Sequence, residues 1–236
     1  HRVESALLPP EGQTLNLGSG IALSPDGRSV AFVTLDESGQ RQLWVQDLSN
    51  SAAVKIDAAR GVSYPFWSPD SRHLGFFTRG MMKRVPANGG PSQDIAQVND
   101  ARSGTWGEDS KIVYSPNYRD GLLIVDAGGG DPEVLTEIDL ERREISHRYP
   151  IFLPDGDHVL FLAQTAEGGS QKDESRVEVI SIATRERAAV LNANSSIAYS
   201  PSGHLLYWHG GSLMVTEFDP ESLRLTGDPY PIAEDV

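Results

Sequence analysis

Short apolar runs separated by polar turns recur along the whole chain, and a similar turn follows the first run of each group. In the first copy, the apolar residues 21–23 lead into Ser24-Pro25-Asp26-Gly27, and a second apolar run follows at 29–33. Pro presets φ in such a turn, Asp accepts a local backbone hydrogen bond, and Gly takes the positive φ that closes the hairpin. The pattern predicts two antiparallel strands joined by a tight turn.

This strand–turn–strand unit occurs five times, with Ser in place of the turn glycine in the second and third copies. The residue before the Pro-Asp position is Ser24, Ser68, Gly107, Leu153 and Ser200, at intervals of 44, 39, 46 and 47 residues. Further apolar runs predict a third and a fourth strand in each repeat, at 43–48 and 53–56 in the first. A period of about 40–50 residues made of short strands is typical of β-propeller blades.

We therefore predict an all-β protein: a single β-propeller domain over residues 1–236, with five four-stranded blades in this chain that belong to a six-bladed or larger ring. The expected segments are an N-terminal closing strand in 1–12 and blades at 13–58, 59–98, 99–138, 139–193 and 194–236. The closing strand, at 3–7, has no partner blade in this sequence. Since free strand edges promote pairing between chains, we expect self-association through open blade edges.

The composition narrows the range of partners. The formal net charge is −13, and such a surface repels nucleic-acid phosphates and anionic lipid headgroups. The chain has no cysteine, which excludes disulfides and thiolate zinc sites. No apolar run reaches the length of a membrane span, so we expect no direct membrane insertion.

Motifs for catalysis, metals and cofactors are not recognisable in the sequence. The six histidines have no metal-ligand spacing, and no Gly-x-Ser-x-Gly motif occurs. The glycine-rich segments 88–91 and 128–132 lie between expected strands and lack the following helix and lysine of a phosphate loop. We therefore predict no catalytic residue, no metal and no cofactor, while a pair of glycosidase-type carboxylates remains open.

Four groups of residues resemble a known repeat family. They are Leu23 to Arg28, Tyr64 to Asp70, Ser146 to Gly156 and Phe218 to Pro220 with Leu225 to Pro229. They resemble the WD40-like (PD40) propeller repeats related to those of TolB. More narrowly, they look like the propeller that follows the kinase domain and a membrane span in many bacterial serine/threonine protein kinases.

The resemblance covers essentially the whole chain, and it implies an extracytoplasmic location, on the periplasmic or cell-surface side. The kinase's own Gly-rich, His-Arg-Asp and Asp-Phe-Gly motifs are absent from the sequence, so we do not expect this chain to be an enzyme. The parent protein would be the kinase.

The segments that enter the first strand of each blade are the best candidates for a ligand site, because propellers commonly bind ligands at the mouth of the central channel. Aligned blade by blade, the candidate ligand-binding residues are Ser63, Tyr64, Arg102, His147, Arg148, Tyr149 and Ser195. Guanidinium and aromatic groups of this kind bind anionic or peptidic ligands. The alternative is that these side chains only satisfy hydrogen bonds between blades, with Arg148 paired to a neighbouring carboxylate.

These observations predict a non-catalytic binding module, the sensor or interaction domain of a bacterial receptor-like serine/threonine kinase. Its partner would be a protein, a peptide or an envelope component at the channel mouth. Two alternatives remain open. One is the substrate-gating propeller of a prolyl-oligopeptidase-type serine hydrolase, and the other is a TolB-like periplasmic scaffold.

Overall fold

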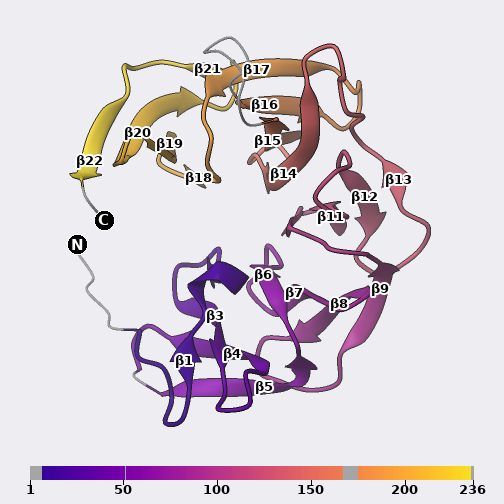
Figure 1. Cartoon of the computed structure of the whole chain (residues 1–236), viewed down its shortest axis with the longest axis vertical. Helices are drawn as coiled ribbons and strands as arrows, with labels where there is room; N and C mark the ends of the chain where they lie inside the picture. Colours follow the sequence, from indigo (N-terminus) through magenta and orange to yellow (C-terminus); the bar gives the residue numbers. More distant parts are fainter. Residues whose placement is uncertain (1–6, 51, 167–174, 235–236) are drawn as a thin grey trace. The chain divides into compact units, whose positions relative to one another are not determined.

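The computed structural model describes residues 7–50, 52–166 and 175–234 (Figure 1). The chain divides into two compact units, residues 1–112 with 125–132 and residues 113–124 with 133–236. The described residues form antiparallel sheets and one short 3-10 helix, η1 (Leu17–Ser19). Among these residues no helix is both long and apolar enough to cross a bilayer.

The first two sheets belong to the first unit. The first contains β1 (Thr14–Leu15), β2 (Ile21–Leu23), β3 (Ser29–Leu35), β4 (Arg41–Asp47) and β5 (Ala53–Arg60). Both β1 and β2 pair with β3, so together they form one interrupted inner strand. The second sheet contains β6 (Ser63–Trp67), β7 (His73–Thr78), β8 (Met81–Pro86) and β9 (Gln93–Gln97).

The unit boundary passes through the third sheet, which contains β10 (Ser103–Trp106), β11 (Lys111–Ser115), β12 (Leu123–Asp126) and β13 (Glu133–Val134). The fourth and fifth sheets belong to the second unit. The fourth contains β14 (Glu144–Phe152), β15 (His158–Thr165), β16 (Arg176–Ser181) and β17 (Arg187–Asn192). The fifth contains β18 (Ile197–Ser200), β19 (His204–His209), β20 (Ser212–Asp219), β21 (Arg224–Leu225) and β22 (Tyr230–Glu234).

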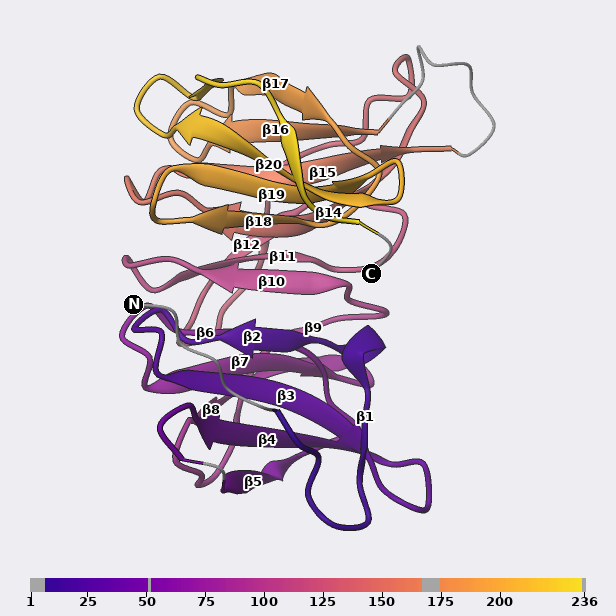
Figure 2. The same cartoon turned by 90° about the vertical axis from the view of Figure 1, so that its left-hand side faces the viewer.

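The predicted all-β class and the five blades are confirmed by five antiparallel sheets, in the last of which β21 and β22 both pair with β20. The six-bladed or larger ring expected around them stays a prediction. Figure 2 shows successive strands side by side in β2, β3, β4 and β5 and in β18, β19 and β20. In the first sheet β5 runs to Arg60, and its pairing with β4 shifts register between Gln42 and Trp44. The expected closing strand at 3–7 falls almost wholly outside the described residues, and residues 7–10 are in no strand. The segment 166–176, whose Glu, Gly, Ser, Lys and Asp residues predict a solvated loop, also lies mostly outside the described residues.

The turn between the first and second strands carries a recurring hydrogen-bond arrangement. Ser24 Oγ donates to Asp26 Oδ1 at 2.5 Å and accepts the Ser29 N–H at 2.9 Å. In the second blade, Ser68 and Asp70 repeat the contact at 2.6 Å. The hydrogen bond from the serine holds the pKa of both aspartates below its usual range. These bonds close each hairpin locally.

Serines at two of these turns adopt the conformation that glycine adopts at the others. The φ values are 59° at Ser71 and 58° at Ser110, against 69° at Gly27, 74° at Gly156 and 79° at Gly203. A side chain in the left-handed region costs about 1–2 kcal/mol, so the two serine turns contain backbone strain that the glycine turns lack.

Close packing of an aromatic ring against glycine positions the first strand of the second blade. The ring of Phe66 lies over Gly75 of β7, and a Cβ at Gly104 of β10 would lie 2.8 Å from Phe66 Cε1. Trp67, next in the strand, donates its indole N–H to Ala22 O at 2.9 Å and so ties the second sheet to the first. The first strand of the second blade is thereby fixed on both sides.

Gly75→Ala is expected to lower the free energy of unfolding by about 1–3 kcal/mol, because the added methyl group would overlap the ring of Phe66 in a packed core. Urea denaturation checks this. Gly18→Ala is the control, since its Cβ would meet only Asn16 Oδ1 at 3.6 Å. Equal stability of the two variants would contradict the packing argument. Adding Phe66→Leu to Gly75→Ala should recover part of the lost stability, because the ring that the new methyl group overlaps is then absent.

Candidate functional site

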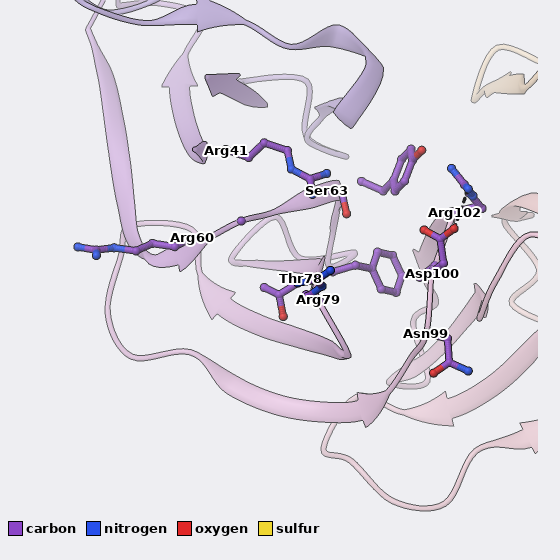
Figure 3. Close-up of a pocket in the computed structure, with 12 residues that line it drawn as sticks. Arg41, Arg60, Ser63, Thr78, Arg79, Asn99, Asp100 and Arg102 are labelled. Carbon is purple, nitrogen blue, oxygen red and sulfur yellow. Dashed lines mark hydrogen bonds and ion pairs between the residues drawn. The ribbon is translucent and has the colours of Figure 1, made fainter. Parts of the chain in front are cut away.

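A cavity of about 760 Å³ lies in the first unit, and its lining is rich in arginine. It forms where the connections β5–β6 and β9–β10 meet the β7–β8 hairpin and the start of β4 (Figure 3). The charged residues of its lining are Arg41, Arg60, Arg79, Arg102 and Asp100. Four cations and one anion make this region positive in a chain whose net charge is −13.

The local backbone places Ser63 and Tyr64 at this cavity. Gly61 turns the chain after β5 with φ of 65°, and its N–H donates to Arg41 O at 2.9 Å. The pairing of β6 with β7 then shifts register between Ser63 and Phe66, and inside this bulge Tyr64 has φ of 49°. A tyrosine in the left-handed region is strained, and such strain occurs often at binding sites.

The arginines of the lining differ in direction and pairing. Arg41 is half-buried and extends toward Ser63, whereas Arg60 is exposed and points away from the other labelled side chains (Figure 3). Arg102 Nη2 lies 2.8 Å from Asp100 Oδ2. The cavity therefore already holds one carboxylate, a group that binds guanidinium through charge-assisted hydrogen bonds.

Three of the predicted site residues line this cavity, namely Ser63, Tyr64 and Arg102. The other four lie in the second unit and make contacts of their own. Arg148 donates from Nε to Ser146 Oγ at 2.8 Å and from Nη2 to Tyr118 O at 3.2 Å.

Tyr149 has φ of 54°, in the same Tyr-Pro step as Tyr64, and Ser195 Oγ accepts the Trp208 N–H at 2.8 Å. Of these contacts, the bond from Arg148 to Tyr118 O joins the fourth blade to the segment between β11 and β12, whereas its bond to Ser146 and the bond between Ser195 and Trp208 lie within single blades.

His147 is fully buried, which differs from its expected place beside an open ligand site. Thr136 Oγ1 accepts the Leu122 N–H at 2.7 Å and lies 2.7 Å from His147 Nδ1, while His147 Nε2 lies 2.9 Å from Glu144 Oε2. This network joins a hydroxyl, an imidazole and a carboxylate through hydrogen bonds in the protein interior. The exposed fractions are 4% for Thr136, 0% for His147 and 2% for Glu144.

The hydroxyl–imidazole–carboxylate order of this chain is that of an activated nucleophile. A substrate has no access to the buried Thr136 hydroxyl, so the network is structural. Only the i, i+3 spacing of Glu144 and His147 marks this network in the sequence. The backbone places both side chains inward through a register shift after Glu144.

Arg187 connects this network to a second buried carboxylate. Its Nη2 lies 2.8 Å from both Glu144 Oε1 and Glu178 Oε2, and its Nη1 donates to Glu137 O at 3.0 Å. The guanidinium also lies over the ring of Phe161 at 5.4 Å. Glu144 and Glu178 are both paired with this guanidinium, and their side chains are almost wholly buried. A glycoside substrate could not reach them, so these two residues are not a carboxylate pair of the glycosidase type.

Burial by itself raises the pKa of Glu144. Hydrogen bonds from His147 and the Asp139 N–H, together with the charge of Arg187, more than offset it and lower the pKa to about 2. Glu144 is therefore ionised at neutral pH. Within the described ranges no three His, Asp or Glu side chains are grouped so as to hold a metal ion.

The five antiparallel blades define the class of protein as a β-propeller, and solved structures of TolB and of other propellers share this fold. No protein-family model matches the chain. Residues of the chain are 29% identical over 146 positions to the uncharacterized peptidase YuxL of Bacillus subtilis, covering 61% of the chain and 21% of that protein. A segment of 52 residues is 35% identical to the Tol-Pal system protein TolB of Alcanivorax borkumensis, covering 22% of the chain and 12% of that protein. The matches thus span about a fifth or less of these relatives.

Solved structures with the same fold include TolB from Acinetobacter baumannii, with a TM-score of 0.65, 16% identity and coverage of 83% of this chain and 50% of that one. A chain of a nidogen/laminin complex has a TM-score of 0.70 at 10% identity, covering 95% and 82%. A prolyl endopeptidase has a TM-score of 0.57 at 17% identity, covering 89% and 34%. At these identities the likeness establishes the fold alone.

Proposed function

We propose that this chain is a non-catalytic, extracytoplasmic propeller module that binds a protein or peptide in the arginine-lined cavity of its first unit. The observation that carries the proposal is the cavity itself, with a volume in the range of about 300–1,000 Å³ that ligand sites occupy. Ser63, Tyr64 and Arg102 line it together, and sequence reasoning had selected these three residues as ligand-binding. Tyr64 is held in a strained conformation there.

Three larger proteins could contain such a module. The resemblance of the repeats favours the sensor of a receptor-like serine/threonine kinase. The match to YuxL over 146 residues, together with the likeness to a prolyl endopeptidase, favours a propeller that gates a peptidase. The likeness to TolB favours a periplasmic scaffold. Sequencing the gene on both sides distinguishes them: a kinase and a membrane span upstream, a hydrolase downstream, or a small α/β domain upstream.

The binding function is tested by selecting peptides from a displayed random library on the purified chain. We expect selected peptides to bind the Arg41→Ala/Arg102→Ala double variant at least about tenfold more weakly, because each substitution removes a charged hydrogen-bond donor. Arg72→Ala is the control, since this exposed arginine lies in a turn outside the cavity.

Failure to recover any peptide whose binding depends on the cavity would refute the proposal. So would a peptidase, esterase, glycosidase or ATPase activity of the chain that one point substitution abolishes.

A further inference from the structure

We infer that the cavity of the first unit recognises carboxylates, and that its ligand is an acidic peptide segment. The inference deepens the proposed function and rests on it. Guanidinium groups bind carboxylates through paired, charge-assisted hydrogen bonds, and Arg41, Arg79 and Arg102 line the cavity together. Within the described part of the chain, Arg41 and Arg79 form no ion pair with an acidic side chain.

The ion pair between Asp100 and Arg102 is an example of a carboxylate bound in this cavity. Asp100 Oδ2 lies 2.8 Å from Arg102 Nη2, and the Asp100 side chain remains 54% exposed at the cavity wall. The pair is accessible to solvent, so its own stability is small, and a ligand carboxylate can compete for the same guanidinium. Asp100 therefore acts as an internal competitor for acidic ligands.

The rest of the lining favours a peptide over a compact inorganic anion. The cavity of about 760 Å³ is far larger than one anion requires, and Ser63 and Tyr64 add hydroxyl groups and one half-buried aromatic ring beside the arginines. Hydroxyls pair with the amides of a peptide backbone, and the ring of Tyr64 can pack against its side chains. The net charge of −13 repels long polyanions, whereas a short acidic segment can reach a locally positive cavity.

The experiment measures the affinity of the full chain for fluorescein-labelled peptides by fluorescence anisotropy. The probe is an acetylated, amidated peptide with three glutamates, and its matched partner carries three glutamines. We expect the glutamate peptide to bind at least about tenfold more tightly, with an affinity that falls as salt is raised.

Three variants test the assignment of residues. Arg41→Ala should weaken binding of the glutamate peptide about tenfold or more. Arg72→Ala is the matched control and should change it less than about threefold, because this exposed arginine lies in a turn outside the cavity. Asp100→Asn should tighten binding by about three- to tenfold, since it removes the internal competitor, and a loss of folding cannot imitate a gain in affinity.

The outcomes separate this inference from the proposed function. Equal, cavity-dependent binding of the glutamine peptide would overturn the carboxylate inference and leave the binding module standing. Displacement of the glutamate peptide by an equal concentration of inorganic tripolyphosphate at matched ionic strength would overturn the peptide assignment. A neutral peptide with a free C-terminus that binds as tightly as the glutamate peptide would support carboxylate recognition and assign it to the chain end.

Discussion

Arg187→Met is expected to lower the free energy of unfolding by about 3–5 kcal/mol, the largest effect predicted for any single substitution in this chain. Arg187 is the shared partner of Glu144 and Glu178, and its removal leaves two neighbouring carboxylates buried beside each other. Methionine keeps an unbranched apolar side chain at this position but lacks the guanidinium that pairs both carboxylates and lies over the Phe161 ring, so the loss reports the missing cation. Urea denaturation followed by tryptophan fluorescence measures it.

Arg185→Ala is the matched control for this substitution. Arg185 is largely exposed and lies 3.7 Å from Glu133, so its removal should cost less than about 1 kcal/mol. Adding Glu144→Gln and Glu178→Gln to Arg187→Met should recover part of the lost stability, because the buried carboxylate charges that lost their shared guanidinium are then gone, although Arg142 and Arg176 stay near Glu178. Equal losses in the Arg187 and Arg185 variants would contradict the interpretation of a buried charge network.

Acid is expected to remove about 3 kcal/mol of stability through Glu144 alone. The folded chain lowers the pKa of Glu144 from 4.5 to about 2, so the unfolded chain binds its proton more readily. The contribution is therefore complete above about pH 5 and is lost as the pH falls from 5 through about 2. His147 and Arg187 face this carboxylate, and Glu178 lies on the far side of Arg187.

The measurement compares the wild type with Glu144→Gln in urea denaturation series between pH 7 and pH 3. The difference in stability between the two should be largest at pH 7 and should shrink toward pH 3. Aspartates in the blade turns also have lowered pKa values, but both proteins contain them, so their effect cancels in the difference. A difference that does not change with pH would show that the carboxylate charge of Glu144 is not what stabilises the fold.

The blades were predictable from the sequence because their determinants are local. The Ser-Pro-Asp turn contains its own donor, acceptor and positive-φ position, so Ser24 and Asp26 close the hairpin without help from distant residues. The same logic identified Ser71 and Ser110 as strained turn positions. Alignment of the repeats at the start of each first strand then identified Ser63, Tyr64 and Arg102, which line one cavity.

The buried network and the full cavity could not be predicted, because they depend on contacts between residues far apart in the chain. Arg187 meets Glu144 across 43 residues, and nothing in either local sequence marks this arginine among the chain's other basic residues. Arg41 and Arg79 reach the cavity from the start of β4 and from the β7–β8 hairpin, positions outside the first-strand alignment. His147 matched the alignment, but a register shift within β14 turned its side chain into the core.

The strand order within the blades has a consequence for synthesis of the protein. The main strands of each blade pair with their neighbours in sequence, and the turns between first and second strands are closed by bonds over two to five residues. Contacts between nearby residues form with little loop-closure cost, and domains fold from the N-terminal side as the chain is made. A hairpin can therefore form as soon as its second strand leaves the ribosome, which shortens the time that its apolar strands are exposed.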